Sequence, residues 1–193
     1  MRGSDEANSA GNPLLPCLIG GIMQANSLFR DLIAKEGLGL ISAEAIPDMY
    51  REVLLGGWMQ DEEGAWLLEY FRSRHHASRS MFVDVAGYEA SVNGRGIPDV
   101  DLPDGGTLRA VTLSRRGYVF AQAALRKLGS IPGHPAMKAY ILICSTGECS
   151  DSDRYTGTVT FASSRRGQAG YLDDVEEITD CAVLVVDISD CTP

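Results

Sequence analysis

Cysteine and histidine side chains are the residues of this chain that could carry out nucleophilic chemistry. Cys144 ends an apolar run, and the polar loop that follows contains Cys149, in the kind of position where nucleophiles are often displayed. A nearby imidazole could take the proton of such a thiol, and His134 lies in a loop. Cys149 and His134 are therefore candidate catalytic residues. The arginine that cysteine phosphatases place six residues after the thiol is absent, so the sequence predicts no complete catalytic set.

The remaining histidines and acids do not have the spacing of a metal site. His75 and His76 are adjacent, so on a helix their side chains would point about 100° apart. Segment 148–153 is rich in oxygen ligands but lacks the glycine and the final glutamate of a calcium-binding EF-hand loop. We therefore expect no metal ion and no cofactor.

Basic residues gather in the middle of the chain. Residues 105–147 hold six bases and no acid. Ser114 is expected to cap a helix there, and the free N–H groups of the first turn, with the guanidinium groups of Arg115 and Arg116, could hold a phosphate or carboxylate. These three residues are the candidate anion-binding site. The alternative is that the arginines neutralise the acidic segments around them.

The acids lie on both sides of this basic segment. Residues 1–104 hold 16 acids and 8 bases, residues 148–193 hold ten acids and three bases, and the whole chain has a net charge of −9. A partner-binding cluster is predicted in the last segment, where the acids are exposed: Asp173, Asp174, Glu176 and Glu177. Such a surface would attract a basic protein.

Helical periodicity dominates the first 76 residues. We predict helices over 14–35, from Pro47 onward and over 61–74. Strand-like patterns then follow at 81–92 (before an Asn93-Gly94 turn), 107–113, 136–144, 157–162 and 180–188, with one helix inserted from Ser114 to Leu128 and ended by Gly129.

This order predicts an α+β fold. N-terminal helices are followed by a mostly antiparallel sheet of about five strands with one inserted helix, and the helices pack on one face. Residues 1–13 are expected to be a disordered leader. Residues 14–193 are expected to form a single domain, with a helical part over 14–76 and a sheet part over 80–190.

The composition of the chain is typical of a globular protein and argues against a membrane-spanning or nucleic-acid-binding one. An apolar share of 45% and a charged share of 22% are ordinary for a globular domain, and no run approaches the roughly 20 apolar residues that span a bilayer. The negative charge argues against nucleic acid as a partner. The five cysteines are an odd number without a close pair, and Cys144 and Cys181 are expected to be small apolar residues of buried strands. A reducing cytoplasm is therefore the favoured compartment.

These observations predict a cytoplasmic, non-enzymatic interaction protein that binds a basic protein partner, and an immunity-type inhibitor of a basic toxin is one concrete form. The alternative is an enzyme or sensor for a small anionic ligand that uses the basic band at 109–127 with a Cys/His pair. Neither nucleic acid nor a membrane is expected as a partner. Self-association through the segments around Trp58 and Trp66 stays open.

Overall fold

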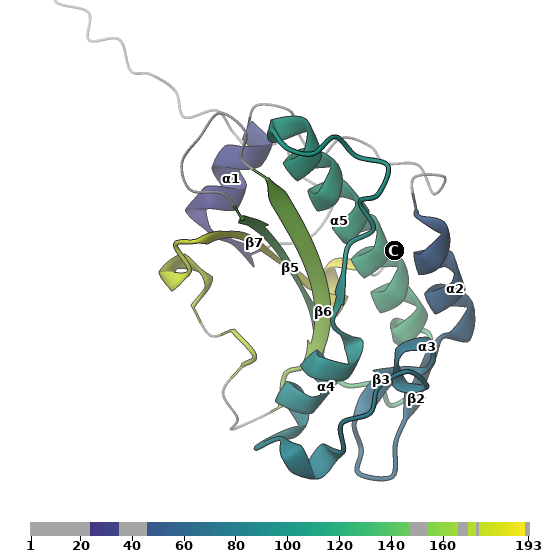
Figure 1. Cartoon of the computed structure of the whole chain (residues 1–193). Helices are drawn as coiled ribbons and strands as arrows, with labels where there is room; N and C mark the ends of the chain where they lie inside the picture. Colours follow the sequence, from purple (N-terminus) through teal and green to yellow (C-terminus); the bar gives the residue numbers. More distant parts are fainter. Residues whose placement is uncertain (1–23, 35–45, 147–153, 166–169, 173, 192–193) are drawn as a thin grey trace, which may run out of the picture.

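The computed structural model describes residues 24–34, 46–146, 154–165, 170–172 and 174–191, and this part of the chain is built around an antiparallel sheet (Figure 1). The strand order is β1-β7-β5-β6-β4. The strands are β1 (Gln24–Ala25), β4 (Arg95–Gly96), β5 (Met137–Ser145), β6 (Tyr155–Ser163) and β7 (Cys181–Asp187). The α+β class with a five-stranded antiparallel sheet is thus confirmed.

Two helices cover one face of the sheet. α5 (Thr107–Gly129) crosses β5, β6 and β7, and α1 (Ser27–Ala34) packs beside it against β7 (Figure 1). α2 (Asp48–Gly56) packs on α5, with the ring of Tyr50 stacked on that of Phe120 at 3.8 Å between centroids. The main core therefore lies between the sheet and α5 and continues to α2.

One further helix, α4 (Val85–Asn93), lies on the opposite face of the sheet. Strand residues alternate between the two faces, so Ile141 faces α5 while Tyr140 belongs to a separate cluster with Ala86 and Ala90 of α4. The expected packing of helices on one face thus holds for α1 and α5, whereas α4 covers part of the other face.

A hairpin replaces the helix predicted over 61–74. β2 (Trp58–Gln60) pairs with β3 (Trp66–Leu68), and only α3 (Glu69–Arg72) of that stretch is helical. The side chain of Asp61 accepts hydrogen bonds from the N–H groups of Glu63 at 3.1 Å and Ala65 at 2.8 Å. Gly64 then takes a φ of 82°, which only glycine adopts readily. Asp61, which was predicted to lie at the start of a helix, therefore stabilises a turn instead.

Two predicted strands are helical. The stretch 81–92 contains a short 3₁₀ turn (Arg79–Met81) and most of α4, which begins where the side chain of Asp84 accepts the N–H of Gly87 at 2.7 Å. The Asn93-Gly94 pair, expected to be a strand turn, ends this helix. Residues 107–113 form the first two turns of α5.

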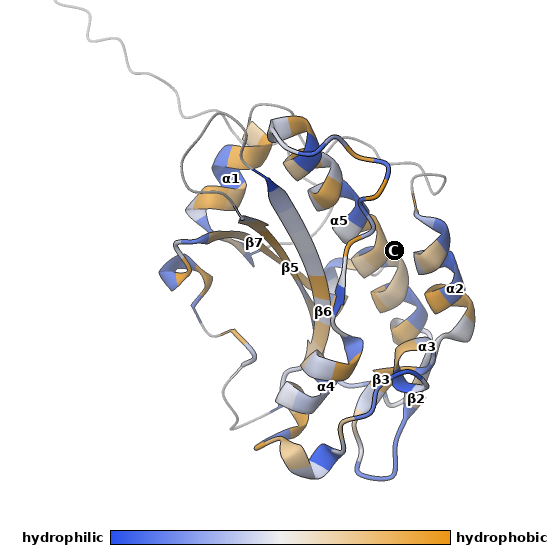
Figure 2. Cartoon of the chain, in the orientation of Figure 1, coloured by the Kyte–Doolittle hydropathy of each residue, from blue (hydrophilic) through white to orange (hydrophobic). Residues whose placement is uncertain are grey.

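The helix predicted over 14–35 is confirmed only at Ser27–Ala34, because Gln24–Ala25 form β1 and residues 14–23 and 35 lie outside the described residues. The remaining predictions of elements hold within the described residues. α2 begins directly after Pro47, α5 ends at Gly129, and the strands expected at 136–144, 157–162 and 180–188 are β5, β6 and β7. Two 3₁₀ turns, Val175–Glu177 and Ile188–Cys191, flank β7. Figure 2 shows hydrophobic residues along β7 and polar residues around the β2–β3 turn. In the described part, no helix is both long enough and apolar enough to span a bilayer. The leader expected at 1–13 lies outside the described residues.

Candidate functional site: an acidic hollow beside a disulfide

One hollow of about 400 Å³ opens where α1 and the first turn of α5 meet the ends of three strands. Figure 1 shows α1 and the start of α5 together at this end of the sheet. We call it the acidic hollow. Its lining consists of Leu28, Asp31, Leu32, Thr107, Ile143, Ser145, Tyr155, Thr179, Asp180 and Ala182.

The floor of the acidic hollow is apolar. Ile143 of β5 and Ala182 of β7 are directly opposite each other in the ladder, and both are buried. Leu28 and Leu32 of α1 form the side wall, and Leu28 keeps 39% of its surface exposed. The hollow can therefore remove part of an alkyl chain from water.

Two carboxylates stand at the rim of the acidic hollow. Asp31 comes from α1 and Asp180 from the turn before β7, and both residues are exposed. Within the described residues no ion pair engages either of them. Sequence reasoning did not single out Asp31 or Asp180, because only the pairing of β1 and α1 with β7 brings them together.

The predicted partner-binding acids are only partly available. Glu176 forms an ion pair with Arg30 at 2.6 Å and accepts the N–H of Ser27, and these contacts lower the pKa of its carboxyl. Asp174 accepts the N–H of Glu176 at 2.9 Å. Glu177 is exposed, and Asp173 lies outside the described residues. Asp174 and Glu176 thus serve mainly to fix the turn before β7.

The predicted anion site does not form as expected. Ser114 lies two turns inside α5, fully buried, and its hydroxyl donates to the carbonyl of Ala110 at 2.9 Å. It cannot cap a helix whose first residue is Thr107. The prediction failed because residues 107–113 look like a strand, which moved the expected helix start seven residues too far along the chain.

Acids of the preceding loop hold the arginines of the basic band. Arg116 donates to both carboxylate oxygens of Asp101, at 2.8 and 2.5 Å, and this hydrogen bonding lowers the pKa of Asp101 to about 2. Arg109 pairs with one carboxylate oxygen of Asp99. Arg115 is half-buried on the same helix. The band therefore fastens the loop 97–106 to α5, as the neutralising alternative predicted.

The proposed pairing of Cys149 with His134 stays a prediction. Cys149 lies outside the described residues, and the Nδ1 atom of His134 is 2.9 Å from the carbonyl oxygen of Pro135 in a loop after α5. Sequence reasoning missed a different pair, in which Nε2 of His75 lies 3.2 Å from the hydroxyl of Ser91 on α4. Burial lowers the pKa of His75, but neither residue lines the acidic hollow.

A smaller hollow of about 330 Å³ lies on the opposite face of the sheet, near Leu142, Thr158 and Tyr171. Its one cationic side chain among the lining residues is Arg95. That guanidinium donates to the carbonyl of Gly94 at 2.5 Å and lies over the ring of Phe71 at 4.6 Å. Arg95 thus caps the end of α4 rather than offering an open anion site.

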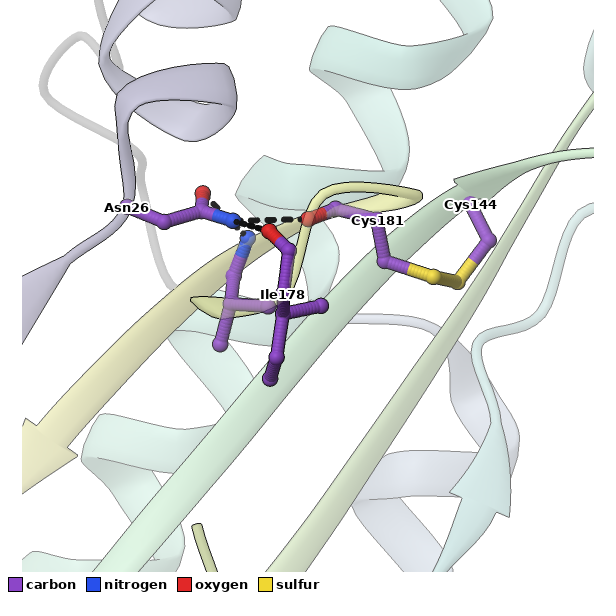
Figure 3. Close-up of a disulfide and its surroundings, with 5 residues drawn as sticks. Asn26, Cys144, Ile178 and Cys181 are labelled. Atoms are coloured by element: carbon purple, nitrogen blue, oxygen red, sulfur yellow. Dashed lines mark hydrogen bonds between the residues drawn. A yellow bond between two sulfur atoms is a disulfide. The ribbon is translucent and has the colours of Figure 1, made fainter. Parts of the chain in front are cut away.

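A disulfide joins Cys144 of β5 to Cys181 of β7, where the sequence predicted two small apolar residues of buried strands (Figure 3). The two residues are directly opposite in the ladder and both are half-buried. The signal was present in the pattern, because both strands were predicted, but their mutual register was not. Figure 3 also shows Asn26 donating to the carbonyls of Ile178 and Cys181, at 2.9 and 2.8 Å.

Comparison with known proteins yields no match, since neither a family model, nor a curated protein, nor a solved structure resembles this chain.

Proposed function

We propose that this chain is a non-enzymatic interaction protein that binds a basic protein partner, and that the acidic hollow receives a lysine or arginine side chain of that partner. The observation that carries the proposal is that Asp31 and Asp180, from distant parts of the chain, line the same hollow, whose floor is apolar.

The chemistry of the acidic hollow suits such a side chain. Lysine and arginine combine an alkyl stem with a terminal cation. The stem would pack between Leu32 and Ile143, while the cation lies between the two rim carboxylates. A small anion would be repelled by the same carboxylates, and this supports the protein-binding proposal over the alternative of an anion-binding enzyme or sensor.

The distribution of charge also supports a basic partner. Arg109 and Arg116 form their ion pairs with Asp99 and Asp101, which leaves the acids near β7 outside these pairs. An inhibitor of a basic toxin remains one concrete form of this function. Because stable disulfides are typical of oxidising compartments, the Cys144–Cys181 bond favours an encounter there over one in the cytoplasm.

Peptide binding tests the proposal. The probe is a fluorescein-labelled peptide with one lysine between leucines, and a second peptide has glutamine in place of that lysine. We expect the Asp31→Asn/Asp180→Asn protein to bind the lysine peptide about 5- to 25-fold more weakly in fluorescence anisotropy, since an exposed ion pair contributes up to about 1 kcal/mol.

The matched control changes two exposed acids of the β2–β3 turn, Glu62→Gln and Glu63→Gln, and so alters the net charge equally. This variant should bind the lysine peptide within about twofold of the parent at physiological salt, where surface charges beyond about 8 Å are screened. Equal losses in both variants, or equal affinity for the lysine and glutamine peptides, would show that the acidic hollow is not the binding site.

A further inference from the structure

The disulfide lies in the same ends of β5 and β7 that line the acidic hollow. Ile143 and Ser145 flank Cys144, while Asp180 and Ala182 flank Cys181, and all four flanking residues line the acidic hollow. Because strand side chains alternate between faces, the sulfur atoms lie on the side opposite the floor. The disulfide therefore fastens the back of the two strand ends that form the site.

In the described part of the chain, the disulfide lies at the very end of the ladder between β5 and β7. The Cys144–Cys181 pair is the last pair of the β5–β7 ladder, and the next pair inward is Ile143 with Ala182. On its other side, the start of β7 is held by the side chain of Asn26, which donates to the carbonyls of Ile178 and Cys181. Ladder ends open at low free-energy cost, so the covalent bond decides how firmly Asp180 is placed.

Neither cysteine of this bond is fully buried. Both cysteines are half-buried rather than enclosed, and they lie beyond the main core under α5. A thiolate needs such access to attack a disulfide sulfur.

We propose that the Cys144–Cys181 disulfide is a reversible redox switch for the acidic hollow, an inference that rests on the function proposed above. A dithiol reductant attacks one sulfur and forms a mixed disulfide, which its second thiol then resolves. The dithiol becomes a disulfide, and its two electrons and two protons convert Cys144 and Cys181 to thiols. Reduction releases the start of β7 from β5, moves Asp180 and Ala182 away from Ile143 in the floor of the acidic hollow, and weakens binding of the cationic side chain.

The test uses the full chain with the substitutions Cys17→Ser, Cys149→Ser and Cys191→Ala, so that every redox response belongs to the remaining pair. Oxidised protein and protein reduced with dithiothreitol are compared by amide hydrogen exchange and by anisotropy with the lysine peptide. Cys144→Ser/Cys181→Ser on the same background represents the permanently opened state.

We expect amide exchange at Ala182 to rise on reduction at least tenfold more than exchange at Phe161 in the centre of β6, whose exchange follows the global stability of the protein. The lysine peptide should bind about fivefold more weakly to the reduced protein, as expected for the loss of one rim carboxylate. Reoxidation should restore both values, and the double serine variant should resemble the reduced form.

Each outcome separates the two proposals. The switch is overturned, whether or not the peptide binds, if exchange at Ala182 rises no more than exchange at Phe161, because reduction would then lower the stability of the whole sheet without opening the start of β7. A local increase at Ala182 with equal peptide affinity in both redox states overturns the control of binding. If the local increase occurs at Ala182 but the lysine peptide binds neither the oxidised nor the reduced protein, the proposed function is refuted. The role of the disulfide in controlling binding is then refuted as well, and only a local opening of β7 is left.

Discussion

Asn26 shows how much a single polar residue can organise. It is fully buried, and its amide NH₂ donates to the carbonyls of Ile178 and Cys181. Its carbonyl oxygen accepts the N–H of Phe29 in α1 and that of Val183 in β7, at 3.0 and 2.9 Å. One side chain thus begins a helix and joins that helix to the strand beneath it.

Replacing this amide should therefore be costly. We expect Asn26→Ala to lower the free energy of unfolding by about 3 kcal/mol, because several buried backbone groups lose their partner. Urea unfolding followed by circular dichroism measures the change. Gln24→Ala, at an exposed position of β1, is the control and should change it by less than about 0.5 kcal/mol. Similar values for both variants would mean that water replaces the lost hydrogen bonds.

Glu89 marks the limit of sequence reasoning at the residue scale. It is completely buried on α4, and its carboxylate accepts the N–H of Trp66 in β3 at 2.9 Å and that of Ser163 in β6 at 2.7 Å. Arg165 lies 3.5 Å from the same carboxylate. These partners are 23 and 74 residues away in the chain, so no local pattern could identify them.

At the scale of elements, α5 approaches the sheet most closely at Gly117. A Cβ atom there would lie 2.9 Å from a methyl group of Ile141 and 2.9 Å from one of Ile97. The Ile141 methyl branches from Cβ on a central strand and has little freedom to move. The close packing of α5 on the sheet therefore requires glycine, which has no side chain, at this position.

We expect Gly117→Leu to destabilise the fold by about 1–3 kcal/mol through overpacking, although leucine is the better helix former. Thermal unfolding by calorimetry measures the effect. The control is Gly129→Ala at the end of α5, where the added Cβ would make ordinary contacts at 3.9 Å with Ile188 and stability should stay equal or rise slightly. A stabilised Gly117→Leu protein would contradict the close approach.

Element prediction succeeded where one physical signal dominated. The apolar, valine-rich run 182–186 and the alternating residues around Val159 and Phe161 identified β7 and β6, and Gly129 identified the end of α5. It failed for α4, which is buried on two sides: Ala86 and Ala90 face the sheet, whereas Tyr88 and Val92 face the hairpin. A helix buried on both sides has no single apolar stripe, so its aromatic and β-branched residues resemble a strand.

The candidate site was less predictable than the fold. The sequence indicated acids near the last strand, but Asp31 became relevant only when α1 packed on β7. The disulfide likewise needed the register that sets Cys144 opposite Cys181. Both features depend on pairings between distant segments, which a single sequence does not specify.

At the scale of the whole molecule, one core connects the parts predicted as helical and sheet-forming. It extends from Phe29 of α1 through Tyr50 of α2 and Phe120 of α5 to Phe161 of β6. A core shared in this way favours a single cooperative unfolding transition, and the single domain predicted from the sequence stays a prediction that this transition would test.

We expect urea unfolding followed by tryptophan fluorescence and by circular dichroism to give coincident transitions. Reduction of Cys144–Cys181 should lower the free energy of unfolding measured by both probes by about 3–4 kcal/mol. The reason is that the unfolded chain is then no longer constrained by a cross-link between residues 37 positions apart. A Cys17→Ser/Cys149→Ser control should retain the oxidised stability. Two separate transitions would instead show that the hairpin region around Trp58 and Trp66 unfolds on its own.

The docking of Asn26 on β7 also has a consequence for biosynthesis. Val183, the residue that pairs with Asn26, is the 157th residue that the ribosome adds after it. During that interval β1 and α1 are already outside the exit tunnel without the strand that buries them, so their apolar side chains are available to chaperones or to neighbouring chains. Translation speed over the last part of the message should therefore influence how much of the newly made protein reaches its native form.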